Sequence, residues 1–283
     1  HVKEVWLPIN QLGDREGLKF NNGEIKMPEE FKIAYKETVD AGWLSTSCKP
    51  EHGGMGVPIF FQTVIWAEFG TSANMALSVL PALSLGVYEV LAEHGEKELV
   101  DYFATNMASG KWSGTMCLTE PHAGTDLGMI TTKAVPQEDG TYLVTGTKIF
   151  ITYGEHDMTE NIVHLVLAKT PDAPEGTRGI SLFFVPKYLP SEWKSEGLSG
   201  VSEELNTQHN GVTCSGSEEK MGVHASPTCV MNFEQSRGWR VGDLYNGMPL
   251  MFEMMNRERL ATGMMGIGLA EIAYQKGNVP GEM

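Results

Sequence analysis

Residues 115–129, TMCLTEPHAGTDLGM, place hydroxyl, acidic and glycine residues directly after an apolar run. A strand that ends at Leu118 and Thr119 leaves backbone N–H groups and a hydroxyl free at its tip. Gly124 permits a ligand to approach closely, and Thr125 offers a second hydroxyl. Such a tip suits the polar rim of a flat heterocycle and an adjoining phosphate. An ordinary turn between two strands has a similar composition, and from this pattern alone it is the commoner case.

A second stretch, GTKIFITYGEH at residues 146–156, reads as a strand that could serve the same ligand. The period of two puts Phe150 and Thr152 on one face. An aromatic ring followed by a hydroxyl suits a stacked ring system and one hydrogen bond. A half-buried strand without a ligand is the alternative, and it is again the commoner case.

Other catalytic signatures are missing from the sequence. The eight histidines show no H-E-x-x-H or comparable spacing, which argues against a metal site. We interpret His122 as a turn residue and His156 as structural. The chain has no Gly-x-Ser-x-Gly elbow and no Gly-x-Gly-x-x-Gly that opens a βαβ unit, so hydrolase and nicotinamide chemistry are not indicated.

The elements that must position these two stretches change in type along the chain. Apolar residues at helical spacing and glycine breaks predict helices through residues 28–110. From about Trp112, short segments rich in β-branched and aromatic residues predict an antiparallel sheet or barrel, with a hairpin at Asp139-Gly140. The helical period returns after Gly247.

This order predicts an α+β protein in three parts. We expect an N-terminal helical domain at residues 1–111, a middle β-domain at 112–243, and the first helix of an incomplete C-terminal helical domain at 244–283. Residues 186–220 are polar and rich in Ser, Glu and Gly, so we expect a long mobile insertion there.

Composition narrows the class of protein. The 283 residues are 41% hydrophobic and carry a net charge of −15, which disfavours nucleic acid or an anionic membrane as the main partner. Four cysteines without Cys-x-x-Cys spacing predict neither disulfides nor a zinc site, and they favour the reducing cytoplasm. The longest nearly apolar run, 13 residues from Met75, is too short to span a bilayer. The chain begins at His1 and ends soon after a helix-like stretch, so we expect a fragment truncated at both ends.

Together, MCLTEPHAGTDLG and KIFIT resemble two motifs of the acyl-CoA dehydrogenase family, about 30 residues apart with helices on both sides. The resemblance covers nearly the whole chain. The segments TENIVHLVLAKTPDAPEGTRGISLFFVP and EEKMGVHASPTCVMNFE are most similar to the longer bacterial branch, which includes 3-methylmercaptopropionyl-CoA and fatty acyl-CoA dehydrogenases.

The resemblance implies roles for the first motif. Met116, Leu118 and Thr119 match residues that line the flavin of FAD, with Leu118 and Thr119 at its pyrimidine edge. Thr125 matches the hydroxyl residue near the FAD pyrophosphate and the acyl-CoA.

It also implies roles for the second motif. Phe150 takes the place usually held by Trp against the isoalloxazine, which removes an indole N–H. Ile151 completes that wall, and the Thr152 hydroxyl lies near flavin N5 in relatives.

The segment NRERL contains the remaining candidate residues. Asn256, Arg257 and Arg259 match a segment near the CoA in relatives, so the resemblance implies substrate binding. Glu258 stands where some branches of the family have the catalytic base. The alternative, which the longer branch favours, is that Glu258 is a solvated residue paired with neighbouring arginines and that the base lies downstream of the chain end.

The implied activity is FAD-dependent α,β-dehydrogenation of an acyl-CoA thioester to its trans-2-enoyl product, as in β-oxidation or dimethylsulfoniopropionate catabolism. The implied partners are acyl-CoA, an electron-transfer flavoprotein that accepts the electrons, and further copies of the chain in a dimer or tetramer. The alternative is a catalytically incomplete homologue that binds a flavin or acyl-CoA but lacks the C-terminal base.

Overall fold

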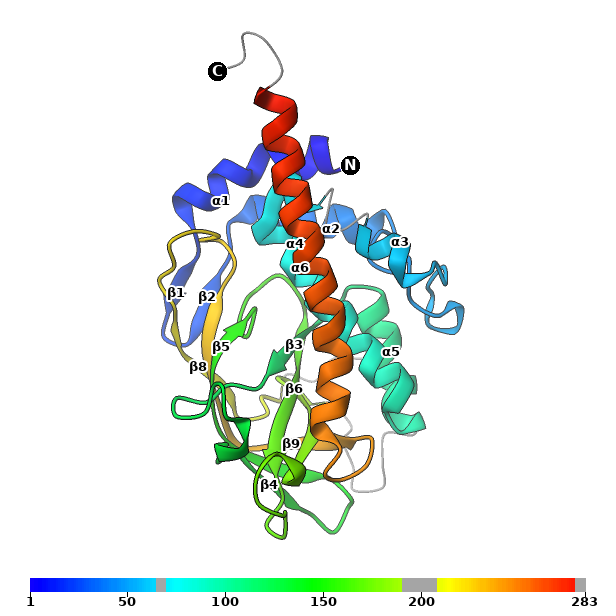
Figure 1. Cartoon of the computed structure of the whole chain (residues 1–283), viewed down its shortest axis with the longest axis vertical. Helices are drawn as coiled ribbons and strands as arrows, with labels where there is room; N and C mark the ends of the chain where they lie inside the picture. Colours follow the sequence, from blue (N-terminus) through cyan, green and yellow to red (C-terminus); the bar gives the residue numbers. More distant parts are fainter. Residues whose placement is uncertain (65–69, 190–207, 278–283) are drawn as a thin grey trace.

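The structure is a computed structural model, and it describes residues 1–64, 70–189 and 208–277. Helices lie at both ends of the chain with a sheet between them (Figure 1). The α-helices are α1 (Asn10–Glu16), α2 (Glu29–Asp40), α3 (Ile59–Val64), α4 (Thr71–His94), α5 (Lys97–Ala108) and α6 (Gly247–Gly277). The strands are β1 (Lys19–Asn21), β2 (Glu24–Lys26), β3 (Trp112–Cys117), β4 (Lys133–Pro136), β5 (Tyr142–Thr152), β6 (Asn161–Lys169), β7 (Ile180–Pro186), β8 (Val212–Ser217) and β9 (Thr228–Val241). Short helical turns are η1 (Val2–Trp6), η2 (Leu7–Ile9), η3 (Pro50–His52), η5 (Leu127–Met129) and η6 (Thr177–Gly179).

The predicted order of helices, sheet and helix is confirmed. The small hairpin of β1 and β2, which precedes α2, was not predicted. Within the predicted helical region 28–110, α3 begins at Ile59, and residues 65–69 lie outside the described part of the chain. The predicted hairpin at Asp139-Gly140 joins β4 to β5, with Gly140 in the left-handed region at φ 79°.

Helix α4 is the buried helix of the N-terminal part, and it packs on β3 and α6. Its backbone is non-helical at Asn74, whose side-chain Oδ1 accepts the Leu77 N–H at 3.1 Å and so caps the longer part of the helix. The apolar run that we considered too short for a bilayer is therefore part of a 24-residue helix that has the length and composition of a membrane span. However, 72% of its apolar window is buried inside the protein, as in a core helix.

The sheet is mixed, so the prediction of an antiparallel sheet is wrong in part. Strands β6, β4, β5, β9 and β7 pair in a closed ring, with β3 added on β6 and β8 on β9. An odd ring cannot alternate direction all the way round, so at least one neighbouring pair must run parallel. Here β4 runs parallel to β6, and β3 also pairs with β6 in parallel.

The loop of residues 118–132 leaves the edge of this sheet between β3 and β4. Both strands pair with β6: Cys117 opposite Val166 and Lys133 opposite Lys169. The chain therefore departs and returns within three residues of β6. The first motif is consequently displayed outside the sheet, with its two ends held close together.

The expected insertion at 186–220 is only partly irregular. It contains strand β8, which pairs with β9, because Val212 and Cys214 are apolar side chains that become buried against the sheet. Residues 190–207, where we expected mobility, lie outside the described residues.

Candidate active site

The two motifs lie side by side. The backbone N–H of Ile149 in β5 donates to the carbonyl oxygen of Thr119, which follows β3, at 2.9 Å. Met116 is half-buried near the end of β3, and Leu118 and Thr119 are half-buried beyond it. The structure therefore brings together the residues that the sequence predicted at one ligand, although they are about 30 positions apart.

A buried ion pair holds the loop of residues 118–132 in place. The Lys148 ammonium donates to Glu120 Oε1 and to the Leu118 carbonyl oxygen, each at 2.9 Å. The Lys148 and Glu120 side chains are 0% and 1% exposed. Glu120 also accepts hydrogen bonds from the backbone and hydroxyl groups of Thr131 and Thr132. One carboxylate thus joins the start of the loop to its end.

The protonation of Glu120 follows from these contacts. Burial by itself would raise the pKa of this carboxyl, but the Lys148 charge and the hydrogen bonds from Thr131 and Thr132 outweigh burial and hold the pKa at about 2. Glu120 is therefore ionised at neutral pH, and the loop depends on the ionised form.

Strand β5 is irregular at the second motif, where we expected plain alternation. Between Lys148 and Ile151 it has one residue more than β9, which is a β-bulge. Phe150 within the bulge has φ 60° and is 57% exposed, while Ile151 is buried. Tyr153 is also left-handed, at φ 53°. Bulky residues in this region are strained, and such strain often accompanies a ligand site.

Three predicted hydroxyls are free for a ligand. Within the described part of the chain, the side chains of Thr119, Thr125 and Thr152 make no hydrogen bond, and none of the three residues is buried. Gly124 is exposed, and an added Cβ would only reach ordinary contact distance, 3.7 Å from the Thr119 methyl group. Among the described residues, neither the backbone conformation nor a steric clash requires a glycine at position 124. Close approach of a ligand would explain why a glycine stands there.

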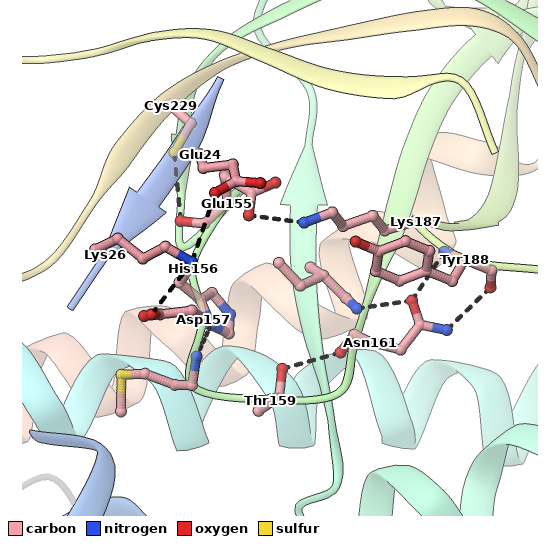
Figure 2. Close-up of polar contacts among 12 residues, drawn as sticks. Glu24, Lys26, Glu155, His156, Asp157, Thr159, Asn161, Lys187, Tyr188 and Cys229 are labelled. Carbon is pink, nitrogen blue, oxygen red and sulfur yellow. Dashed lines mark hydrogen bonds and ion pairs between the residues drawn. The ribbon is translucent and has the colours of Figure 1, made fainter. Parts of the chain in front are cut away.

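The segment behind Thr152 is anchored on several sides, as Figure 2 shows. Glu155 accepts from the Lys187 ammonium at 2.8 Å, and the two side chains are 5% and 13% exposed. Asp157 accepts from the backbone N–H of Met27 at 2.9 Å and pairs with Lys32. The segment that follows β5 is thereby tied to Lys187, which follows β7, and to α2 and the residue Met27 before it.

The surroundings of His122 and His156 fit the interpretation of these histidines as a turn residue and a structural residue. His122 lies in the loop, where its ring Nε2 is 3.1 Å from the Met129 carbonyl oxygen. His156 is buried and its ring Nε2 is 3.0 Å from the Ser113 hydroxyl. Burial lowers the pKa of His156 to about 3, so this ring is neutral. No group of potential metal ligands occurs among the described residues.

The four candidates on α6 do not lie together. Arg259 and Asn256 share an exposed face, where the Arg259 guanidinium donates to Asn256 Oδ1 at 2.9 Å. Arg257 points toward α4 instead and forms an ion pair with Glu89. Asn256 and Arg259 are thus available to an external ligand, whereas the Arg257 side chain is only 10% exposed.

Glu258 is not the solvated, arginine-paired residue that one interpretation expected. Its Oε1 atom is buried, and it has no hydrogen-bond partner among the described residues. The carboxyl faces Gly86 of α4, where an added Cβ would lie 3.4 Å from Oε1. Burial raises the pKa of Glu258 to about 7, and the neighbouring Glu89 adds to this effect while Arg257 opposes it.

Lys148 and Glu120 were missed from the sequence, although a signal was present. Val144 and Lys148 both take buried positions on β5, so a lysine stands where the strand pattern calls for an apolar residue. A buried lysine needs an acidic partner. Glu120, next to the tip of β3, was an available one.

Sequence comparisons agree with this geometry. The family model "Acyl-CoA dehydrogenase, N-terminal domain" matches residues 17–111, and "Acyl-CoA dehydrogenase, middle domain" matches residues 115–236. The chain belongs to the acyl-CoA dehydrogenase family. The resemblance stated from the two motifs is confirmed, and the second match contains both of them.

Among curated relatives of this family member, 3-methylmercaptopropionyl-CoA dehydrogenase of Ruegeria pomeroyi is 46% identical over 272 residues, which are 96% of this chain and 44% of that protein. Butyryl-CoA dehydrogenase of Syntrophomonas wolfei is 38% identical and aligns with 96% of this chain and 45% of that protein. The chain therefore spans a little under half the length of these relatives. A solved acyl-CoA dehydrogenase from Bacillus anthracis, complexed with FAD, shares the fold with a TM-score of 0.75 at 23% identity, covering 98% of this chain and 42% of that one.

Proposed function

We propose that the protein is an FAD-dependent acyl-CoA dehydrogenase that converts an acyl-CoA thioester to its trans-2-enoyl product. The observation that carries this proposal is the meeting of the two motifs, with free hydroxyls and an exposed, strained Phe150 beside the loop that Glu120 and Lys148 hold. The named activities of two relatives support a short acyl group such as 3-methylmercaptopropionyl or butyryl.

Residues of the first motif would contact different parts of FAD. Leu118 and Thr119 would contact the pyrimidine edge, with Met116 behind them. Thr125 would contact the pyrophosphate and the acyl-CoA, because its exposed hydroxyl lies on the projecting loop. Bound FAD would supply the acceptor for the hydride that leaves the β-carbon of the substrate.

The second motif would form the wall of the same site. The exposed ring of Phe150 offers a flat apolar surface, and Ile151 fixes the backbone by its burial. The Thr152 hydroxyl, without a partner in the described chain, would donate a hydrogen bond to the flavin. The exposed pair of Asn256 and Arg259 would bind the CoA portion of the substrate.

Glu258 is the candidate in this chain for the base that removes the α-proton. Its Oε1 atom, buried and without a hydrogen-bond partner among the described residues, suits a group that exchanges a proton near neutral pH. The competing location is a segment of the protein outside these residues.

The remaining assignments follow from the resemblance. We propose electron transfer to an electron-transfer flavoprotein, a homo-oligomeric assembly, and the three parts with the boundaries given above. All four cysteines are buried and free, which supports the cytoplasm as the location.

Anaerobic mixing of the purified protein with 3-methylmercaptopropionyl-CoA or butyryl-CoA tests the function. We expect bound FAD that loses its oxidised absorbance on mixing, and an enoyl-CoA product. A protein that binds FAD and acyl-CoA but shows neither change would be the catalytically incomplete homologue.

We predict that Thr152→Ala slows flavin reduction about tenfold while FAD affinity changes little. One hydrogen bond that strengthens in the transition state has about this effect. Stopped-flow reduction and FAD titration of the apoprotein measure the two quantities, with Thr147→Ala, elsewhere on β5, as the matched control. Equal reduction rates in Thr152→Ala and the parent would remove the role of this hydroxyl.

We predict that Glu258→Gln lowers the rate of flavin reduction by about 10²–10⁴-fold, the usual effect of removing a general base. The isosteric amide keeps the contact with Gly86 but accepts no proton. Asn256→Ala is a useful comparison, because it should weaken substrate binding more than it slows reduction. An undiminished rate in Glu258→Gln would assign the base to another segment of the protein.

A further inference from the structure

The interface of α4 and α6 contains charged groups that the flavin site does not use. Helix α6 lies close to α4 at Gly86, where an added Cβ would be 2.9 Å from Met254 Cγ. One helical turn beyond Gly86, Glu89 faces Arg257, and Glu258 follows Arg257 in the chain. Two carboxyl groups and one guanidinium group are thus gathered at a largely apolar contact between helices.

The charges at this contact are unevenly paired. Arg257 is adjacent to Glu258, yet its guanidinium forms an ion pair with Glu89. Glu258 Oε1 is left buried without a hydrogen-bond donor among the described residues. A carboxylate in that position normally recruits a nearby cation, because burial without a partner is costly.

We propose that Glu89 is a positioning residue, which holds the Arg257 guanidinium away from Glu258 and so leaves Glu258 Oε1 without a hydrogen-bond donor among the described residues. Glu258 is the candidate base of the proposed function. The catalytic importance of Glu89 rests on that proposed function, but the effect of Glu89 on Arg257 and Glu258 does not. Removing the Glu89 charge allows Arg257 to turn to Glu258.

The other titratable and charged groups near Arg257 support a direct effect of Glu89 on Arg257. Burial raises the pKa of Glu89, against the opposing charge of Arg257. Burial also raises the pKa of the nearby Cys48 thiol to about 12, so this thiol is neutral. The other arginine of the segment, Arg259, lies over the Phe252 ring at 5.0 Å and bonds to Asn256. Among the described residues, Arg257 is the arginine of this segment that contacts Glu89, so we expect it to respond to a change at Glu89.

The test is a direct titration of Glu258 in the purified full-length protein. Glutamate labelled with ¹³C at the carboxyl carbon gives one signal per residue, and comparison with Glu258→Gln identifies the signal of Glu258. In Glu89→Gln we expect the titration midpoint of Glu258 to fall by about one pKa unit or more, as when a guanidinium approaches a carboxylate. The matched control is Glu93→Gln, one turn further along α4, where Glu93 pairs with Lys49 at 3.5 Å and is 62% exposed. This control should leave the midpoint unchanged.

A second variant separates movement of Arg257 from the simple loss of a like charge. If Arg257 moves to Glu258, Glu89→Gln should lower the midpoint much less in an Arg257→Met background than in the parent protein. An unchanged midpoint in Glu89→Gln, or a fall of equal size in the parent and Arg257→Met backgrounds, would overturn the proposal. If Glu89→Gln does not fold, Glu89→Asp shortens the pair by one methylene and should give a smaller shift in the same direction. Since the readout needs no turnover, a protein inactive toward acyl-CoA could still confirm or refute the role of Glu89.

Discussion

Replacing Lys148 by Met is expected to destabilise the protein by about 3–5 kcal/mol and to abolish retention of FAD. The substitution leaves the Glu120 carboxylate buried without its cation, and the removal of one partner of a buried pair costs this much. It also removes the hydrogen bond to the Leu118 carbonyl oxygen, so the tip of β3 loses its anchor. Urea unfolding and the flavin content of the purified protein measure the two effects.

Two further variants make this prediction specific to the ion pair. Adding Glu120→Gln to Lys148→Met removes the uncompensated charge, so the double variant should lose less stability than the sum of the single variants. Lys133→Met changes an exposed lysine of β4 and should alter stability by less than about 0.5 kcal/mol. A Lys148→Met protein that keeps both parental stability and FAD would show that the pair does not organise the loop.

The second large effect is expected at Lys187, whose loss should destabilise the protein more at high pH than at low pH. Burial raises the pKa of Glu155, and Lys187 partly opposes that rise. A buried acid with a raised pKa stabilises the fold below its unfolded value and loses that contribution as the pH rises through the folded value. In Lys187→Met the pKa of Glu155 should rise further, because burial is then unopposed.

We expect a cost of about 2–4 kcal/mol at pH 8 and a smaller cost at pH 5, because acid favours the protonated form of Glu155. Chemical unfolding at both pH values measures the cost. The double variant Glu155→Gln with Lys187→Met should show no extra pH dependence, and Lys36→Met on the exposed face of α2 should have little effect at either pH. A cost independent of pH would mean that packing of the Lys187 stem matters more than its charge.

The position of the first motif was predictable because its signals are local. Residue types that leave a strand tip open predicted that Leu118, Thr119 and Thr125 follow a strand, and the structure has them on the loop after β3. That these residues contact a ligand stays a prediction. The prediction that Phe150 and Thr152 lie on one face of a regular strand was wrong, because it assumed that side chains alternate without interruption along β5. Phe150 lies in a bulge, and a bulge depends on how β5 pairs with β9, two strands far apart in the chain.

The sequence by itself determined the order of the helical and sheet regions and the family, because periodicity, glycine breaks and the two motifs are all properties of neighbouring residues. The tertiary structure decided three things that no local pattern encodes. The closed ring of strands must contain a parallel pair, because the ring has an odd number of strands. Lys148 meets Glu120 because the folding of the sheet brings β5 against the tip of β3. Glu258 Oε1 is buried because α6 packs on α4 at Gly86, and burial rather than residue type determines how readily a carboxyl group accepts a proton.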